Sequence, residues 1–215
     1  MSLTLYFHPL SSYCQKALVA LYEGDVPFER HLLDLLDDTV RTRFRELWPI
    51  GKMPVLRDDA RDQTIPEATI IIEYLAAHRR GCAPLVPADP ELAWQTRLRD
   101  RFYDLYVSDP MQRIVGDRLR PDGSKDPLGV EQAMASLATA YGFIDRAMSG
   151  RTWAIGETFT MADCAAAPAL HYANLVAPLS AHPNAAAYLE RLMRRPSFAR
   201  AYAEAEPYRQ MVPKA

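Results

Sequence analysis

A polar segment near the N-terminus, Ser11-Ser12-Tyr13-Cys14-Gln15-Lys16, carries hydroxyl and thiol groups where strand-like residues give way to helical ones. Unpaired N–H groups and the positive dipole at such a helix start stabilise an anion, and a thiolate in particular. Lowering a thiol pKa by two units from about 8.5 is worth about 2.7 kcal/mol. A serine hydroxyl donates a hydrogen bond to a thiolate without competing as a nucleophile. The segment therefore predicts thiolate stabilisation, although plain capping by Ser11 or Ser12 and simple burial of Cys14 explain the same residues.

Two further segments carry groups that suit ligand binding. In Gly51-Lys52-Met53-Pro54-Val55-Leu56, a proline that opens a strand leaves main-chain groups of Met53 and Val55 free to pair with something else. A cis Met53–Pro54 bond would explain this placement. Glu67 begins a predicted helix, where its carboxylate is stabilised by the helix dipole or could instead hold a ligand amine. Each signal is weak alone, since an acidic residue in a first helical turn most often stabilises the helix and binds no ligand.

A fourth segment, residues 156–164, indicates folding rather than chemistry. Thr160 is the predicted N-cap of a helix and Asp163 follows three residues later, which is the spacing of a capping box. Phe159 stands at the position of the hydrophobic staple. We therefore assign this segment to helix initiation.

The elements that position these segments fall into two parts. Residues 3–77 alternate between strand and helix, with strands predicted at 3–7, 28–33 and 55–56 and helices at 12–21 and 70–77. Ser12 and Gln15 predict a capping box for the first of these helices, and Gly24 predicts its end. Residues 81–90 are rich in proline and predict a linker. Beyond the linker only helical periodicity appears, including a helix at 129–149 and a long helix with the apolar stripe Trp94, Leu98, Phe102 and Leu105.

Composition narrows the class of protein. The 25 Lys and Arg residues nearly balance the 27 Asp and Glu residues, so nothing favours nucleic acid or an anionic membrane as a partner. Residues 164–181 carry no charge, but their alanines and two prolines predict a buried helix rather than a membrane span. Three separated cysteines, Cys14, Cys82 and Cys164, predict neither disulfides nor a metal site. With no signal-peptide pattern at the N-terminus, we expect a cytoplasmic protein.

Taken together and in this order, these segments resemble the cytosolic glutathione transferase family. SSYCQK is similar to the family's active-site segment, GKMPVL to its cis-proline loop, PEATIIIEYL to its γ-glutamyl-binding segment and GETFTMADC to the capping-box segment of its helical domain. The resemblance covers nearly the whole chain. It implies an α+β protein with a thioredoxin-like domain over residues 1–80, the linker 81–90 and an all-α domain over residues 91–215. It also implies a homodimer that uses glutathione as co-substrate.

The resemblance assigns roles to individual residues. Ser11 matches the serine that activates glutathione in the theta- and zeta-like classes, and Pro54 matches the cis proline. Val55 would pair its backbone with the cysteinyl part of glutathione, and Glu67 would bind the γ-glutamyl end. The remaining implied glutathione contacts are Lys52, Met53 and Ala68.

Two positions leave alternatives open. The family usually has a serine where this chain has Ala68, and the missing hydroxyl costs about one hydrogen bond of roughly 1 kcal/mol unless Thr69 replaces it. Other classes activate the thiol with a tyrosine near the end of the first strand, where Tyr6 stands. We favour Ser11 over Tyr6, with Ser12 and Cys14 behind, because of its place at a helix start.

The implied reaction is attack of a glutathione thiolate, formed near Ser11, on a small hydrophobic electrophile. We expect the electrophile between the domains, in a pocket lined by His8, Leu10, Tyr103, Tyr106 and Met111. The aromatic residues of the long helix fit a dimer interface or the core equally well. The alternatives are a glutathione-dependent isomerase, a thiol–disulfide reductase using Cys14, and a non-enzymatic interaction protein. A lone cysteine forms only mixed disulfides, which weakens the reductase hypothesis.

Overall fold

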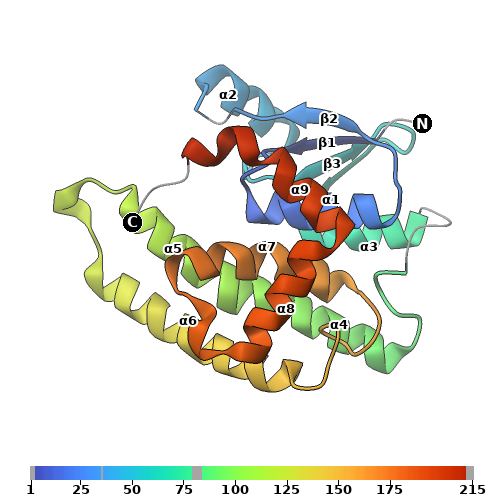
Figure 1. The fold of residues 1–215 in the computed structure, drawn as a ribbon. Helices are drawn as coiled ribbons and strands as arrows, with labels where there is room; N and C mark the ends of the chain where they lie inside the picture. The colour runs from blue at the N-terminus through green and yellow to red at the C-terminus, as the bar shows by residue number, and fades with distance from the viewer. Residues whose placement is uncertain (1–2, 35, 79–83, 212–215) are drawn as a thin grey trace.

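A computed structural model describes residues 3–34, 36–78 and 84–211. The chain forms an N-terminal domain around a four-stranded sheet and a helical C-terminal domain beside it (Figure 1). The strands are β1 (Leu3–Phe7), β2 (Glu29–Leu32), β3 (Val55–Asp58) and β4 (Gln63–Pro66), in the sheet order β2-β1-β3-β4. β1 and β2 are parallel, and the other two pairs are antiparallel. The predicted strands are confirmed, whereas the sequence pattern does not locate β4.

Helices cover both faces of the sheet. The helices α1 (Ser12–Glu23) and α3 (Ala68–His78) lie on one face, and α2 (Asp38–Leu47) lies on the other (Figure 1). Phe44 of α2 packs in a small cluster with the buried side chains of Leu33 and Val55. The sequence predicts α1 and α3 but not α2, whose buried face consists of Phe44 alone.

The start of α1 differs from the prediction by one residue. Ser11, and not Ser12, is the N-cap, and its Oγ accepts a hydrogen bond from the Cys14 N–H at 3.3 Å. The Gln15 side chain does not return to the cap, because its Nε2 donates to the Pro9 carbonyl at 2.8 Å. Gly24 is the C-cap, as predicted. The cap therefore places the Ser11 hydroxyl at the positive end of α1.

The C-terminal domain surrounds one central helix, α7 (Met161–Val176), which packs against α1 and α4 (Figure 1). The other elements are α4 (Pro90–Phe102), the π-helix η1 (Tyr103–Ser108), α5 (Asp109–Arg118), η2 (Asp122–Ser124), α6 (Pro127–Met148), η3 (Leu179–Ala181), α8 (Pro183–Arg194), α9 (Pro196–Glu204) and η4 (Glu206–Met211). Residues 161–170 are all buried, so the buried helix expected within residues 164–181 is confirmed in its first part, while α7 ends at Val176 and Leu175 is exposed. Within the described ranges, none of the helices combines the length and apolar character that a bilayer crossing needs.

The predicted linker falls partly outside the described residues, as does Cys82. Residues 84–89 form no helix or strand, and α4 begins at Pro90. Leu85 is buried, and its carbonyl accepts a hydrogen bond from the Met161 N–H at 2.8 Å. This segment is therefore attached to the start of α7. The domain boundaries 1–80 and 91–215 stay a prediction.

The apolar stripe, which runs from α4 into η1, faces outward except at Phe102, which packs against the core, and the periodicity alone does not reveal this. Trp94, Leu98 and Leu105 are 50%, 56% and 47% exposed. The buried side of α4 consists instead of Ala93, Thr96 and Asp100. Because Asp100 forms an ion pair with buried Lys16, the polar side of the helix is held inward.

The predicted capping box at α7 is confirmed. Asp163 Oδ2 accepts a hydrogen bond from the Thr160 N–H at 2.8 Å. Asp163 does more than cap, because its Oδ1 also accepts from the Ala154 N–H at 2.8 Å and from the Tyr188 hydroxyl at 2.6 Å. Burial raises the pKa of Asp163, and these hydrogen bonds oppose that shift. One carboxylate thus joins α7, α8 and the turn before them.

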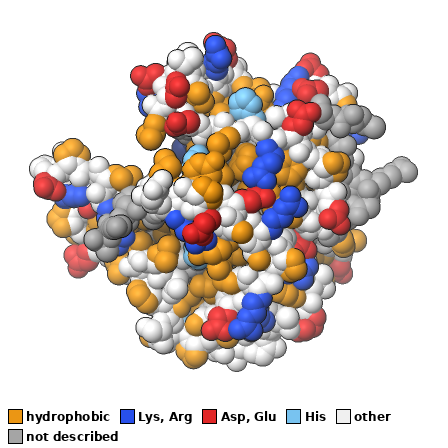
Figure 2. All heavy atoms as spheres, turned by 45° about the horizontal axis from the view of Figure 1, so that its top comes forward, with side chains coloured by type: hydrophobic (Ala, Val, Ile, Leu, Met, Phe, Trp, Pro, Cys, Tyr) orange, Lys and Arg blue, Asp and Glu red, His pale blue; other side chains and the backbone are white. Residues whose placement is uncertain are grey.

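The surface carries charges of both signs. On the face shown in Figure 2, Lys and Arg side chains lie among Asp and Glu side chains instead of gathering in one patch. Some of these charges pair within one helix, as Arg113 does with Asp109 at 3.0 Å. Such exposed pairs contribute little to stability.

Candidate functional site

A cavity of about 560 Å³ lies where the N-terminal domain meets α4 and η1. Its volume is in the usual range for a small-molecule site. We call it the junction cavity, and it is lined by Tyr13, Lys52, Met53, Pro54, Glu67, Ala68, Thr69, Ile70, Arg101, Asp104 and Leu105. Five of the seven residues expected to contact glutathione are in this list: Lys52, Met53, Pro54, Glu67 and Ala68.

The other two expected residues, Ser11 and Val55, do not line the cavity. Ser11 is half-buried at the N-cap of α1, two residues before the cavity residue Tyr13. Val55 is fully buried and follows directly after Pro54. Each of the two is thus close in sequence to a residue that lines the cavity, Ser11 to Tyr13 and Val55 to Pro54.

The backbone around Pro54 and Glu67 has unusual geometry. The Met53–Pro54 peptide bond is cis, as the sequence suggests. Val55 stands opposite Pro66 of β4, and a proline has no N–H group to donate to it. Glu67 has φ of 69°, in the left-handed region that non-glycine residues rarely adopt and that often occurs at functional sites. Both segments thus present irregular main chain at the cavity.

The junction cavity contains both signs of charge. Glu67 and Lys52 are exposed, and among the described residues the Glu67 carboxylate has no hydrogen bond or ion pair. Arg101 Nη1 lies 3.6 Å from Asp104 Oδ2. Two cationic and two anionic side chains suit a ligand that itself carries ammonium and carboxylate groups.

A buried ionic cluster lies beside this cavity and shares Thr69 and Asp104 with its lining. The Lys16 side chain is 1% exposed, and its Nζ lies 2.7 Å from Asp100 Oδ1 and 2.8 Å from Asp104 Oδ2. Nζ also donates to Thr69 Oγ1 at 2.8 Å. The cluster joins α1 and α3 to α4 and η1, and we call it the junction cluster. Breaking a buried pair of this kind leaves an uncompensated charge, so the cluster fixes the two domains together.

Thr69 does not replace the hydroxyl that Ala68 lacks. Its Oγ1 donates to Asp100 Oδ2 at 2.7 Å and accepts from Lys16 Nζ. A hydroxyl has one hydrogen to donate, and here Asp100 takes it. In this geometry Thr69 therefore has no hydrogen left to donate to the glutamyl carboxylate, and the expected compensation is wrong.

Cys14 is unsuited to act as a nucleophile. It is fully buried, and burial raises the pKa of its thiol to about 12 despite the hydrogen bond with Ser11. This burial argues against the reductase alternative that uses Cys14. Ser12 is also buried, as the first residue of α1.

Tyr6 lies in β1, and its ring is near His31 of β2 and Phe44 of α2. Its ring centre is 4.5 Å from that of His31 and 6.3 Å from that of Phe44. Tyr6 does not line the junction cavity. This placement favours the Ser11 alternative, because Ser11 belongs to the segment that supplies Tyr13.

The five residues expected to line an electrophile pocket do not share a cavity. Tyr103 and Met111 are only 3% and 4% exposed and belong to the core, so their assignment to a pocket is wrong. Tyr106 is 55% exposed, and its ring centre lies 5.3 Å from that of Phe102. His8 and Leu10 lie instead beside the C-terminal segment, where the His8 ring is 4.9 Å from Tyr208. The π-helix η1 changes the helical register at Tyr103, which residue spacing alone does not predict.

Three site residues escape the sequence reasoning. Tyr13 lies within the predicted active-site segment, and its hydroxyl is 3.5 Å from the Asp104 carbonyl oxygen. Burial raises the pKa of Tyr13 to about 12, with Asp104 adding to the shift. Arg101 at the end of α4 and Asp104 in η1 are the other two, and only their spacing of three residues gives a signal.

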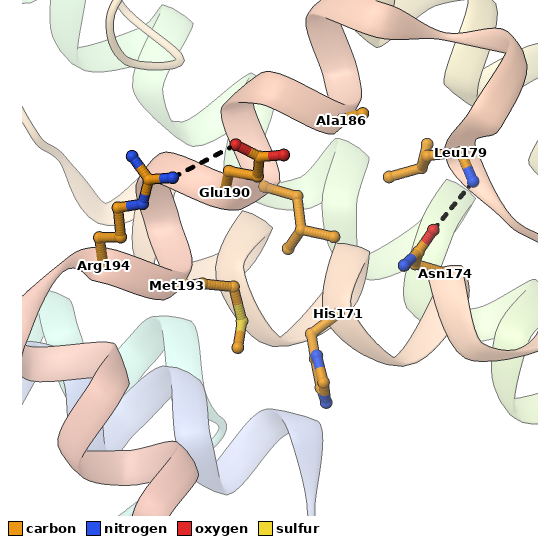
Figure 3. Close-up of a pocket in the computed structure, with 8 residues that line it drawn as sticks. His171, Asn174, Leu179, Ala186, Glu190, Met193 and Arg194 are labelled. Atoms are coloured by element: carbon orange, nitrogen blue, oxygen red, sulfur yellow. Dashed lines mark hydrogen bonds and ion pairs between the residues drawn. The ribbon is translucent and has the colours of Figure 1, made fainter.

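A second cavity, of about 400 Å³, lies between α7 and α8 (Figure 3). In this view Asn174 points to the Leu179 N–H, which donates to it at 2.9 Å, and Glu190 points to Arg194. It shares no lining residue with the junction cavity. Within the described part of the chain, no group of three or more His, Cys, Asp or Glu residues could hold a metal ion.

A sheet of this order, with a cis proline before its third strand and a helical domain beside the cavity, defines the glutathione transferase fold. The family model of the glutathione S-transferase N-terminal domain matches residues 5–82, and that of the C-terminal domain matches residues 127–191. The chain belongs to the glutathione S-transferase family, and it is an enzyme of that family.

Individual relatives agree with this membership. A probable maleylacetoacetate isomerase of Caenorhabditis elegans is 28% identical over 209 residues, which cover 94% of each chain. A glutathione S-transferase structure from Methylobacillus flagellatus with bound glutathione is 26% identical, with a TM-score of 0.85 over 93% of this chain and 98% of that one. A Methylobacterium radiotolerans glutathione S-transferase in complex with glutathione sulfonate is also 26% identical, with a TM-score of 0.83 over 100% of this chain and 96% of that one.

Proposed function

We propose that glutathione binds in the junction cavity and that Ser11 donates a hydrogen bond to its thiolate at the start of α1. The observation that carries the proposal is the convergence of the Pro54 and Glu67 segments on one cavity of mixed charge. The positive end of α1 lowers the cost of a thiolate beside Ser11. The thiol proton leaves to solvent, and the thiolate sulfur then bonds to a carbon of a small hydrophobic electrophile, either displacing a leaving group as an anion or adding to a double bond whose other carbon takes up a proton.

Each end of glutathione has a candidate partner in this proposal. The Glu67 carboxylate, which has no partner in the described part of the chain, receives the γ-glutamyl ammonium group, and the backbone N–H of Ala68 meets the glutamyl carboxylate. The main chain of Val55 pairs with the cysteinyl part, since Pro66 donates no hydrogen bond to Val55. Met53 and Pro54 pack against the ligand, and Lys52 attracts its remaining carboxylate. This use of a serine corresponds to the theta- and zeta-like classes.

Isomerisation is the second candidate reaction. It is favoured by the similarity to the Caenorhabditis elegans protein named as a probable maleylacetoacetate isomerase. Addition and later release of the same thiolate would serve an isomerase without consuming glutathione. Both reactions use the same glutathione site.

We also propose a cytoplasmic homodimer. The exposed stripe of Trp94, Leu98 and Leu105, continued by Ile70 at 52% exposure, supplies an apolar surface beside the junction cavity. Pairing of two such surfaces would bury these side chains and border both cavities. The two described cysteines, Cys14 and Cys164, are free and buried, which suits a reducing compartment.

Calorimetric titration with glutathione tests the site. Glu67→Gln removes a charge-assisted hydrogen bond worth about 1.5–3 kcal/mol, so we expect binding roughly ten- to a hundredfold weaker. Ala68→Ser should bind up to about fivefold more tightly, because it adds one hydrogen bond of about 1 kcal/mol.

The matched control is Glu131→Gln, the same change at an exposed position of α6. It should leave the Kd of glutathione unchanged. Unaltered affinity in Glu67→Gln, with a folded protein, would show that the ligand does not use this cavity as proposed.

A further inference from the structure

A third cavity, of about 200 Å³, lies beside the residue that precedes Ser11. It is lined by Leu10, His171, Tyr172, Leu175, Tyr202, Ala205 and Arg209, from the loop before α1, the end of α7, α9 with its C-cap, and η4. We call it the C-terminal cavity. It shares His171 with the cavity of Figure 3 and no residue with the junction cavity. A molecule held here contacts Leu10, which directly precedes Ser11 in the chain.

The wall of this cavity is mostly aromatic and aliphatic. The His171 ring centre lies 5.1 Å from that of Tyr172 and 4.8 Å from that of Tyr202. Burial, with a smaller effect of the Arg209 charge, lowers the pKa of His171 to about 4, so the imidazole is neutral at pH 7. Arg209 is therefore the one full charge among the residues that line the C-terminal cavity.

Arg209 is held in place by two contacts and neutralised by a third. Its guanidinium carbon lies 4.0 Å from the centre of the Tyr202 ring, and Nη2 donates to the Tyr202 carbonyl at 3.4 Å. Nη1 forms an ion pair with Glu206, whose side chain is 64% exposed and does not line the cavity. An exposed ion pair of this kind is weak, so an anion inside the cavity can displace the Glu206 carboxylate and pair with Arg209.

We propose that the C-terminal cavity holds the electrophile and that Arg209 selects electrophiles with a carboxylate on a flat apolar frame. This inference rests on the proposed function, since it places the second substrate beside Leu10 and Ser11. The Tyr172 and Tyr202 rings contact the frame of the ligand, and the guanidinium binds its carboxylate. Glu206 competes with that carboxylate and sets the strength of the selection.

Binding of two matched aromatic probes tests the selection without any turnover. We choose 4-nitrobenzoate and 4-nitrobenzamide, which differ in charge but little in size, and measure the Kd of each by calorimetric titration. Wild-type protein should prefer the benzoate by tenfold or more. Arg209→Gln should abolish the preference, whereas Glu206→Gln should increase it, because the competing carboxylate is gone.

The control is Arg194→Gln, which removes another exposed arginine, paired with Glu190 at 3.5 Å in α8. It should leave the preference unchanged. Equal affinity for the two probes in the wild-type protein, or a preference that survives Arg209→Gln, overturns the proposal. Neither result depends on glutathione, so failure of the proposed glutathione site is detected separately, by the titrations of Glu67→Gln.

Inhibition kinetics then locate the bound anion. With 1-chloro-2,4-dinitrobenzene as acceptor, 4-nitrobenzoate should compete with the acceptor and not with glutathione. Competition with glutathione instead would place the anion in the junction cavity and overturn the assignment to the C-terminal cavity. In Arg209→Gln the inhibition constant of 4-nitrobenzoate should rise tenfold or more, with the KM for glutathione unchanged.

Discussion

Two groups of buried side chains, one around the Asp163 carboxylate and the other the junction cluster, differ in which parts of the molecule they hold together. Asp163 accepts hydrogen bonds from Thr160, Ala154 and Tyr188, all within the helical domain. The junction cluster instead joins Lys16 of the first domain to Asp100 and Asp104 of the second. Asp163 has no full positive charge among these partners and does not line the junction cavity, whereas Asp104 does. The first cluster serves the fold, and the second connects the fold to the ligand site.

The largest expected effect comes from the junction cluster. Lys16→Met leaves Asp100 and Asp104 buried without their cation, so we expect a loss of about 3–5 kcal/mol in the free energy of unfolding. Glutathione should also bind more weakly, because Asp104 lines the cavity. Urea denaturation and calorimetric titration measure the two effects.

Thr69→Val tests the same connection in a variant that keeps all three charges. The loss of its hydroxyl leaves Lys16 and Asp100 each without one partner, which costs about 1–3 kcal/mol. Normal glutathione affinity in this variant, together with normal affinity in Lys16→Met, would contradict a link between the cluster and the site.

A smaller effect should follow from removing the Asp163 carboxylate. Asp163→Ala leaves the Ala154 N–H and the Tyr188 hydroxyl unpaired, so its cost should exceed the roughly 0.5–2 kcal/mol of a lost helix cap. Thr160→Ala should stay within that range, because it removes only the cap side chain. Activity per folded molecule and the Kd of glutathione should be unchanged in both. Thermal melts rank the variants, and an unchanged midpoint in Asp163→Ala would remove its structural role.

The smallest effect concerns pH and a second tie between the domains. Glu23 of α1 accepts hydrogen bonds from Arg195 Nε at 2.8 Å and Nη2 at 2.6 Å. Burial alone would raise the pKa of Glu23, but the hydrogen bonds from Arg195 and Ser197 bring it below the ordinary 4.5. The unfolded carboxyl therefore takes up its proton at a higher pH than the folded one. Stabilisation is complete above about pH 4.5 and is lost as the pH falls through the folded value.

Glu23→Gln should accordingly lower the thermal midpoint at pH 7 by an amount that corresponds to about 1 kcal/mol. The wild-type and variant midpoints should converge as the pH falls below 4.5. Glu190→Gln, which removes an exposed carboxylate paired with Arg194, serves as the control. A gap between wild type and Glu23→Gln that stays constant from neutral to acid pH would exclude the proton linkage.

The distance along the chain between interacting residues decides how much could be predicted from the sequence. Thr160 and Asp163 are three residues apart, so their capping box is visible in the chain. The cis proline segment and Glu67 were found in the same way, as local patterns. Lys16 and Asp104 are 88 residues apart, and no local pattern pairs them.

The remaining errors have physical causes. The buried side of α4 is polar at Asp100, because that carboxylate pairs with Lys16, so hydrophobic periodicity could not decide whether the apolar stripe faces the core or a dimer interface. The π-helix at Tyr103 then changes the register, which buried Tyr103 and Met111 instead of exposing them to a pocket. Tertiary contacts decided both features, and spacing along the chain does not encode them.

The pKa of the bound glutathione thiol tests the central claim most directly. Thiolate absorbance in the ultraviolet, followed against pH with saturating glutathione, gives this pKa for the wild type, Ser11→Ala and Tyr6→Phe. We predict that Ser11→Ala raises the pKa of the bound thiol and lowers kcat/KM at least tenfold, and up to about 10²–10³ as for other preorganised donors. Tyr6→Phe should change neither quantity. Full activity and an unchanged thiol pKa in Ser11→Ala, with both lost in Tyr6→Phe, would contradict the role of Ser11.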